Sequence, residues 1–364
     1  MKILLISYGD IDFDGRLRSL ISVFSKIGEV RSLTRGRHPF NDISQTTNSA
    51  YSKFILEAIR FAKHVGEVDL LVLDNRKATI PGRIIQMLNK PHYTIQDCRE
   101  LYLFNEVRHL TGRIGCIFER MMARKADIVI CANQERCTIM QKTYKLKRAP
   151  IPYENLRSLK YESEESLIKA KRRLDSYIHK GEYRIVSSSG CSVERTNDIL
   201  VKNIKRVDKK CRLFLVGDST GKDKKIIESI INRKQLKNIV ILGRLDQTEL
   251  KYLISRCHLG IVNYGQYDTN NKYCASGKLY EFLYEGLPVV TTTNPPLKRL
   301  CDKYGIGVAD DAYYIGINHI VEDYHQYKER VASFVENNTV IDNDNKLLTT
   351  ILERLNRDSN HKRN

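Results

Sequence analysis

The chain has 364 residues, 41% hydrophobic and 29% charged, which predicts a globular protein of two domains and argues against long disorder. No apolar run reaches the roughly 18 residues that span a bilayer. The short stretch Ile3 to Ile6 is not expected to be a signal peptide, and nine cysteines without a CxxC pair argue for a reducing cytoplasm and against a zinc site. The net charge of +18 predicts a phosphate-rich partner, but without Trp or a nucleic-acid-binding motif we expect no nucleic acid.

The chain opens with a strand–helix–strand pattern. Lys2 to Ser7 is an apolar run typical of a buried parallel strand, and Glu29 to Thr34 is the next strand. Between them Asp14 is a plausible N-cap of an amphipathic helix. The unit lacks GxGxxG, so it predicts no dinucleotide site. Arg16, near the carboxyl end of a strand, could meet a phosphate or an acceptor, or it could simply be an exposed arginine.

Basic residues then lie among apolar ones in two helical stretches. Such surfaces suit an anionic membrane, and a solvated basic face is the alternative. The residues are Lys53, Arg60 and Lys63 among Phe54, Ile55, Ile59 and Phe61, followed by Arg76, Lys77, Arg83 and Lys90.

Charged residues crowd the end of a later strand. Val68 to Leu73 is a buried strand, and a helix begins at Pro81-Gly82. His92 to Ile95 is a short strand, and Asp97-Cys98-Arg99-Glu100 follows it. Because strand carboxyl ends line the crevice of an open α/β sheet, these residues are a site candidate. An internal salt-bridge cluster is the alternative.

The rest of the first half and the second half continue the alternation of strand and helix. A second parallel, doubly wound sheet is therefore expected, and the fold class is α/β. The run from Gly217 to Lys222 is one residue short of a P-loop and is rejected as one. The further predicted elements are a helix at Gly112 to Lys125, a strand from Ala126, an exit from the first domain at Arg148 to Asn155, a hinge within Tyr161 to Lys180, strands at Tyr183 to Ser189, Cys211 to Val216, Val240 to Leu242 and Leu259 to Val262, a helix from Gln247 and a final helix at Leu347 to Leu355.

Asn271 to Thr293 is the most informative stretch. A helix is predicted from Lys278 to about residue 285, because Gly286 is typical of the position just past a helix end, and Val289 to Thr293 reads as a strand. Lys278 lies in the first turn, where the helix dipole disfavours a cation unless an anion lies between them. Glu281, one turn on, could accept two hydrogen bonds from a ribose diol. A surface Lys–Glu pair is the simpler alternative.

This stretch resembles the nucleotide-sugar-binding segment of glycosyltransferases of the two-Rossmann GT-B architecture, retaining family 4 (glycosyl transferases group 1). Lys278 matches the lysine that faces the diphosphate, and Glu281 matches the glutamate that grips the ribose. Ser276 and Leu279, at the start of the same helix, are assigned to the donor site with them. Position 273 is Tyr, where the family often carries a second glutamate.

The start of the second half resembles the same family. Gly190 corresponds to the glycine loop under the diphosphate, and Arg195 lies where relatives carry a phosphate-contacting cation. Cys191 replaces an arginine often found beside that glycine. The resemblance therefore implies that Arg195, Lys278 and Arg244 together supply the positive charges that contact the diphosphate.

The first half carries the acceptor side of the resemblance. Asp14 and Arg16 match an Asp-x-Arg before the first helix. Asp97, Arg99 and Glu100 match Asp-x-Arg-Glu-Leu-Tyr, which faces the acceptor and the donor sugar in a subset of these enzymes. Many relatives have His where Arg99 stands.

The resemblance implies two facing Rossmann-like domains with a cleft between them. Residues 1–165 would bind the acceptor and 166–345 the nucleotide sugar, and 346–364 would form a helix that crosses back to the first domain and a basic tail. A nucleotide-diphosphate sugar, with a UDP-sugar favoured, would be a substrate, and no cofactor or metal is expected.

The implied chemistry is transfer of the sugar with retention. Arg195 and Lys278 would stabilise the charge on the leaving diphosphate, as fixed cations do. In a retaining reaction that phosphate can take the acceptor's proton, whereas Asp97 or Glu100 would be the base if the reaction inverts.

The expected setting is cytoplasmic synthesis of a bacterial surface polysaccharide on a glycan or polyprenyl-linked acceptor. A peripheral contact with the inner face of the cell membrane would suit the basic first domain. A nucleotide-sugar epimerase on the same fold and a basic nucleic-acid-binding protein stay open as alternatives.

Overall fold

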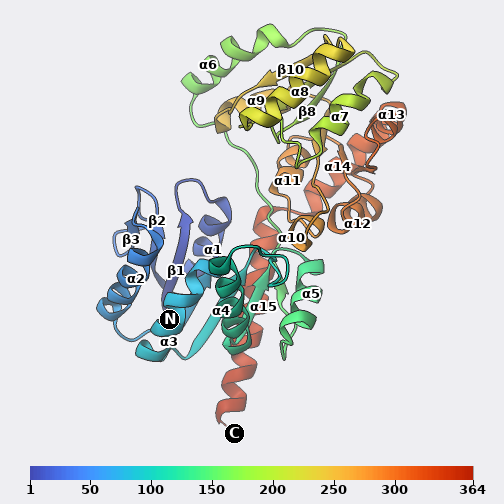
Figure 1. Cartoon of the computed structure of the whole chain (residues 1–364). Coiled ribbons are helices and arrows are strands. Elements are labelled where there is room, and N and C mark those ends of the chain that lie inside the picture. Colours follow the sequence, from blue (N-terminus) through green and yellow to red (C-terminus); the bar gives the residue numbers. More distant parts are fainter. Residues whose placement is uncertain (364) are drawn as a thin grey trace. The chain divides into compact units, whose positions relative to one another are not determined.

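The structure is a computed structural model that describes the backbone of residues 1–363 and the side chains of residues 1–357. The chain forms two compact units, one of Met1–Asn155 with the C-terminal segment from Ile341 and one of Leu156–Val340 (Figure 1). The sequence predicted the boundary between the domains at residue 165, whereas the structure divides the chain after Asn155. Side chains of the expected basic tail beyond Arg357 lie outside the described residues.

The described residues of the first unit build a seven-stranded parallel sheet in the order β3-β2-β1-β4-β5-β6-β7. Its strands are β1 (Lys2–Asp10), β2 (Glu29–Arg35), β3 (Gln45–Thr47), β4 (Leu70–Asp74), β5 (Tyr93–Cys98), β6 (Ile128–Cys131) and β7 (Ile151–Pro152). Its helices are α1 (Gly15–Ser25), α2 (Tyr51–Val65), η1 (Arg76–Ala78), α3 (Thr79–Asn89), α4 (Leu110–Lys125), α5 (Gln134–Tyr144) and α15 (Val340–Arg363).

Strand β1 is apolar throughout because both faces of the sheet are covered. Ile3 and Leu5 pack in the cluster that holds α1 and α15, whereas Leu4 and Ile6 pack in the cluster that holds α2 and α3. Successive side chains of a strand point to opposite faces, so this alternation follows directly from the pleat. Helix α15, red in Figure 1, contributes Leu347, Ile351 and Leu355 to the first of these clusters and is part of this unit.

The described residues of the second unit build a six-stranded parallel sheet in the order β10-β9-β8-β11-β12-β13. Its strands are β8 (Tyr183–Ser187), β9 (Cys211–Val216), β10 (Ile239–Leu242), β11 (Leu259–Val262), β12 (Val289–Thr291) and β13 (Gly307–Ala309). Its helices are α6 (Glu164–Leu174), η2 (Asp175–Tyr177), α7 (Asn197–Asn203), η3 (Ile204–Arg206), α8 (Gly221–Lys234), α9 (Gln247–Ser255), α10 (Thr269–Lys272), α11 (Gly277–Tyr284), α12 (Pro295–Tyr304), α13 (Tyr314–Glu322) and α14 (Tyr324–Asn337).

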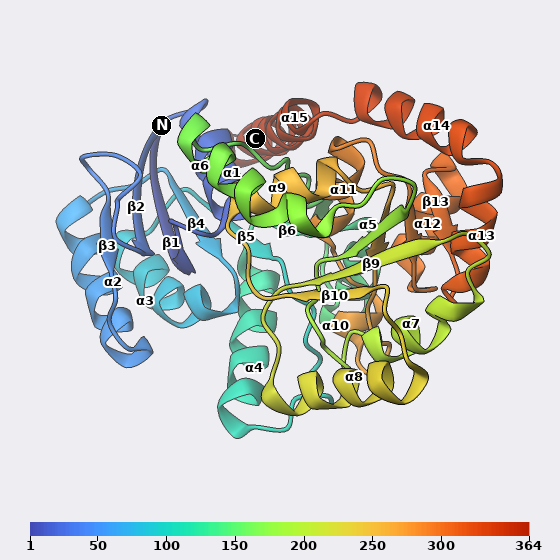
Figure 2. The ribbon, with the colours of Figure 1, turned by 90° about the horizontal axis from the view of Figure 1, so that it is seen from above.

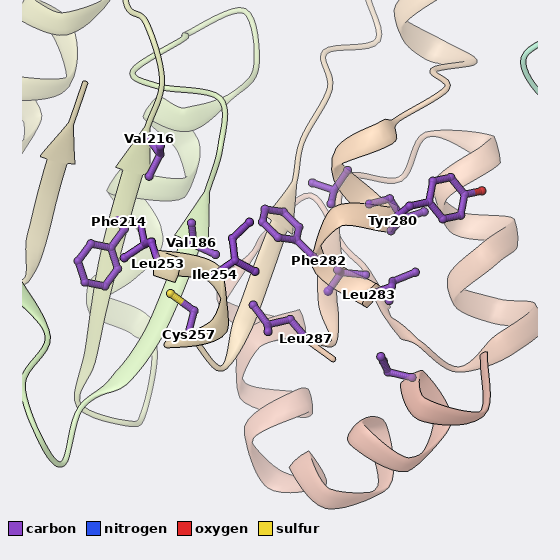
Figure 3. Packing of buried hydrophobic residues seen from close by; sticks show 14 of the residues in the cluster. Val186, Phe214, Val216, Leu253, Ile254, Cys257, Tyr280, Phe282, Leu283 and Leu287 are labelled. Atoms are coloured by element: carbon purple, nitrogen blue, oxygen red, sulfur yellow. The ribbon is translucent and has the colours of Figure 1, made fainter. Parts of the chain in front are cut away.

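Helices cover both faces of this second sheet as well. Figure 2 shows α8 on one side of β9 and β10 and α9 on the other. The α9 side contains a large apolar cluster to which β9 contributes Phe214 and α11 contributes Phe282 and Leu283 (Figure 3). These clusters and the two parallel sheets confirm the predicted doubly wound α/β fold.

Most predicted elements are present with small changes of boundary. Strands Cys211–Val216 and Leu259–Val262 are confirmed residue for residue, and Asp14 is confirmed as the N-cap of α1 because it accepts a hydrogen bond from the Leu17 N–H. Strand β5 continues to Cys98, so Asp97 lies inside the strand and not after it. Residues expected to hold the hinge form α6, which packs on α9 within the second unit.

A buried carboxyl group lies on the inner face of α4. Glu119 is only 1% exposed, and its Oε2 accepts a hydrogen bond of 3.0 Å from the hydroxyl of Tyr144. Its Oε1 has no hydrogen-bond partner among the described residues. Burial raises the pKa of Glu119 from its ordinary value of 4.5 to about 7.

We expect the replacement Glu119→Gln to stabilise the protein in a pH-dependent way. The unfolded chain ionises Glu119 near pH 4.5 and the folded chain near 7, so the wild type loses stability as the pH rises between these values. At about 1.4 kcal/mol for each pKa unit, the variant should be more stable by about 3 kcal/mol at pH 8 and nearly unchanged at pH 4. Urea unfolding at both pH values measures this, with the exposed Glu67→Gln as control. An equal effect at both pH values would contradict the prediction.

Candidate functional site

The strand order of each sheet creates one place where ligands are expected. Strand β8 lies between β9 and β11, and β1 lies between β2 and β4. The loops that leave such neighbouring strands run to opposite faces of the sheet, which opens a crevice at the carboxyl ends of the strands. Asp14 and Arg16 follow β1, and Gly190 and Arg195 follow β8.

In the second unit the loop after β8 is held against the end of β9 by Gly190. The Gly190 N–H donates a hydrogen bond of 2.7 Å to the carbonyl of Val216, and its φ is +59°. A Cβ at this position would lie 2.4 Å from the carbonyl oxygen of Asp218. The amide of Asn197 donates to the Gly190 carbonyl from the other side, at 2.8 Å. Only glycine fits this backbone conformation and this spacing.

Lys278 lies in the first turn of α11 and donates a hydrogen bond to the carbonyl of Ser188. Burial, together with the nearby charges of Arg195 and Arg157, lowers the pKa of Lys278 to about 8, against the opposing effect of Glu281. Two cations are therefore held together at a helix N-terminus, where the helix dipole is also positive. Such a place favours an anion.

Polar atoms without partners surround this pair. Nη1 of Arg195 is buried and has no hydrogen-bond partner among the described residues, while the guanidinium lies over the Tyr264 ring at 4.0 Å. The hydroxyls of Ser188 and of Ser276, the N-cap of α11, are buried and equally lack a partner within that part of the chain. Buried donors of this kind are normally satisfied, so a bound ligand is the simplest partner for them.

Glu281 follows one turn later on α11 and is 5% exposed. Burial raises the pKa of its carboxyl, and Arg157 and Lys278 oppose that rise. Nη2 of Arg157 lies 2.6 Å from Oε1 of Glu281. The surface Lys–Glu pair considered from the sequence is thus wrong for Glu281, which is buried. Sequence reasoning missed Arg157, because nothing in its local pattern distinguishes it.

The side chains of two other predicted donor-site residues do not lie beside Lys278 and Arg195 in a buried site. The Leu279 side chain is buried in the apolar cluster below α11, so only its backbone can face a ligand. Arg244 is mostly exposed and lies 3.8 Å from the equally exposed Asp218. Its contact with a ligand stays a prediction.

In the first unit the predicted charged residues lie together and neutralise one another. Arg16 grips both carboxylate oxygens of Asp97, at 2.7 and 2.9 Å, and Asp97 is fully buried. Arg99 bonds Asp74 through Nε at 3.1 Å and also bonds Asp14, which caps α1. The internal salt-bridge cluster considered from the sequence therefore describes these contacts.

Burial and the charges of the ion-pair partners shift the pKa values in this cluster in opposite directions. Burial raises the pKa of Asp74 against the opposing charge of Arg99. Asp97 raises the pKa of Arg16 despite the burial of its guanidinium. Sequence reasoning missed Asp74, although a carboxylate directly after the buried run Leu70 to Leu73 was a usable signal.

Glu100 is the most exposed of the three residues predicted to be catalytic. Its side chain is 40% exposed and lies 3.7 Å from Arg136, another residue that the sequence did not indicate. Asp97, by contrast, has no exposed surface, and Arg99 is 14% exposed. Within the described residues, no group of three or more His, Cys, Asp or Glu side chains is arranged to hold a metal ion.

No protein-family model and no curated protein matches the chain. Solved structures of low sequence identity do match it. HepE from Anabaena, in complex with UDP and glucose, is similar over 97% of this chain and 100% of its own, with 15% identity and a TM-score of 0.71. WaaG, a glycosyltransferase involved in lipopolysaccharide biosynthesis, is similar over 96% of this chain and 99% of its own, with 15% identity and a TM-score of 0.66.

A structure of different activity is also similar. The UDP-GlcNAc 2-epimerase from Neisseria meningitidis, bound to UDP-GlcNAc, matches 98% of this chain and 100% of its own, with 12% identity and a TM-score of 0.60. These similarities and the order of the strands confirm the predicted fold. The chain has the GT-B type of fold, with two Rossmann-like α/β units.

Proposed function

We propose that the chain is a glycosyltransferase that binds a nucleoside-diphosphate sugar on its second unit. The observation that carries this proposal is the start of α11, where Lys278 and Arg195 lie together beside buried hydroxyls that have no partner among the described residues. A diphosphate supplies the missing negative charge and acceptors, and Glu281 lies one turn away to receive the ribose. The UDP and UDP-glucose bound in the HepE structures support a UDP-sugar as donor.

The two cations also suit the chemistry of transfer. Negative charge grows on the diphosphate as the sugar–phosphate bond breaks, and fixed cations in a site shielded from water stabilise that charge. Lys278 and Arg195 would do this without a metal ion. We further propose retention, with the leaving phosphate as acceptor of the proton. If the reaction inverts, Glu100 is the better base than Asp97, because Arg16 occupies both oxygens of Asp97.

For the acceptor we propose a glycan or polyprenyl-linked molecule in the synthesis of a bacterial surface polysaccharide. The role of WaaG in lipopolysaccharide biosynthesis supports this setting. Arg16, Asp14, Asp97 and Arg99 would then shape the acceptor side of the first unit through their mutual contacts. Glu100, which is more exposed, would contact the acceptor or the donor sugar directly.

Nucleoside diphosphates should bind in a way that depends on Glu281. We expect one of UDP, GDP and ADP to raise the melting temperature, since a ligand of the native state stabilises it by mass action. The variant Glu281→Ala should weaken binding of that nucleotide roughly tenfold, the loss expected for a hydrogen bond to a charged group. Calorimetry measures both affinities.

The matched control is Glu285→Ala, which removes another ion-paired carboxylate at the end of the same helix. It should leave the affinity unchanged.

If no nucleotide binds, and a short DNA duplex binds with steep salt dependence, the chain is a basic nucleic-acid-binding protein instead. If the nucleotide sugar is converted without any acceptor into its epimer, with no release of the nucleoside diphosphate, the chain is an epimerase.

The affinity for that nucleoside diphosphate should also fall at high pH. Free Lys278 loses its proton near pH 8, and the bound diphosphate favours the protonated form. Binding should therefore weaken several-fold between pH 7 and 9. Calorimetry across this range tests the point. The variant Lys278→Met should bind weakly with no such decline, and an unchanged decline in the variant would exclude Lys278 as its cause.

We also propose that the outer face of α4 contacts an anionic membrane. Leu110, Ile114 and Ile117 are exposed and lie at positions i, i+4 and i+7, so they form one apolar stripe on the helix. Exposed arginines at 108, 113 and 120 flank the stripe. Basic residues around an apolar face suit the headgroups and acyl chains of an anionic leaflet. None of the helices in residues 1–363 is both long and apolar enough to cross a bilayer.

The basic stretch expected from the sequence in α2 fits a membrane less well. Its aromatic residues Phe54 and Phe61 are buried in the core beneath the helix, so they cannot enter a bilayer. The exposed apolar stripe of α4 is therefore the surface that we propose for the membrane.

Vesicle sedimentation tests this surface. The wild type should bind vesicles rich in phosphatidylglycerol and bind poorly to vesicles of pure phosphatidylcholine. The double variant Ile114→Asp, Ile117→Asp should lose most of this binding, because it puts charge on the apolar face. The control Ile315→Asp changes an exposed isoleucine of the second unit and should bind as the wild type does. Equal binding by all three proteins would refute the α4 contact.

A further inference from the structure

Arg157 reaches the nucleotide site from a part of the chain far from α11. Its Nη2 lies 2.6 Å from Oε1 of Glu281, and the two side chains are 48% and 6% exposed. The buried carboxylate therefore has a half-exposed cation as its partner. A carboxylate at this depth would favour its neutral form if that partner were absent.

The position of Arg157 is fixed by its neighbours. Leu156 and Leu159, on either side of it, pack against the apolar cluster that contains Leu279 and Leu283 of α11. The segment is thus anchored on the same core that seats the helix. The backbone that carries Arg157 is therefore placed beside α11 by packing, independently of the ion pair.

Gly277 makes room for this arrangement. A Cβ on the first residue of α11 would lie 2.6 Å from Nε and 2.8 Å from Cζ of Arg157. The guanidinium consequently lies directly against the helix backbone at its N-terminus. The helix dipole disfavours a cation there, so the arrangement needs a compensating carboxylate, and Glu281 supplies it.

The charges that act on Glu281 come from two elements. Arg157 faces it from the segment before α6, and Lys278 faces it from its own helix. Arg195 faces Lys278 in turn. Of these cations, Arg157 is the one that bonds the Glu281 carboxylate directly.

We propose that Arg157 is a positioning residue of the nucleotide site, whose guanidinium keeps the buried Glu281 carboxylate charged and oriented for the ribose diol. This inference rests on the proposed nucleotide-binding function. A charged carboxylate accepts hydrogen bonds from both ribose hydroxyls, whereas a protonated one offers a weaker acceptor and a donor in the wrong place. Arg157 thus acts through Glu281 and keeps the carboxylate available to the ribose as the pH falls.

The test compares affinities for the nucleoside diphosphate that stabilises the wild type, between pH 5.5 and 7, below the range in which Lys278 loses its proton. In Arg157→Ala the Glu281 carboxylate loses its cation and its pKa rises further, so affinity relative to the wild type should fall about tenfold, with the loss greatest at the lowest pH. Arg157→Lys keeps a cation and should restore most of the affinity at low pH. In a Glu281→Gln background, Arg157→Ala should have no further effect, because the two residues act as one unit.

The chain provides a closely matched control. Arg173 and Glu249 form another ion pair in the same unit at 2.8 Å, with side chains 46% and 5% exposed. Arg173→Ala should lower stability as Arg157→Ala does and leave nucleotide affinity and its pH dependence unchanged.

The outcomes separate the two proposals. If the wild type binds no nucleotide, the proposed function fails. If it binds but Arg157→Ala matches it at every pH, or binds more tightly because Arg157 competes with the ribose, the function stands and the positioning role is overturned.

Discussion

Charge that has been removed from water must be compensated nearby, and the two units meet this constraint differently. In the first unit Asp97, Asp74 and Asp14 each contact the guanidinium of Arg16 or Arg99, so every charged side chain of the cluster has a partner of opposite charge within it. In the second unit Lys278 and Arg195 crowd together, and buried polar atoms around them lack partners among the described residues. The incomplete compensation marks the second unit as the place for an anionic ligand.

Helix α11 connects this electrostatic requirement to the core. Its Phe282 and Leu283 are buried in the apolar cluster on the α9 side of the second sheet, which fixes the helix in position (Figure 3). The same packing presents Lys278 at the helix start and Glu281 one turn on. The site is therefore built on a rigid element, as precise binding of a phosphate and a ribose requires.

Helix α4 combines packing and surface chemistry in the first unit. Its inner face buries Glu119 and Met122, whereas its outer face exposes Leu110, Ile114 and Ile117. An apolar stripe open to water has no role in the stability of the unit. The proposed contact with a lipid surface would give it a role in binding and would explain why basic residues lie beside it.

The sequence by itself determined the parallel α/β fold, the N-cap at Asp14 and the placement of Lys278 and Glu281 one turn apart on one helix, because all of these follow from patterns that are local in the chain. Only the tertiary structure decided that Arg16 forms an ion pair with Asp97 and that Arg157 forms one with Glu281. These partners lie far apart in the chain, and the order of strands and the packing of loops bring them together. No local periodicity records such contacts, which is why Arg157 emerged from the structure alone.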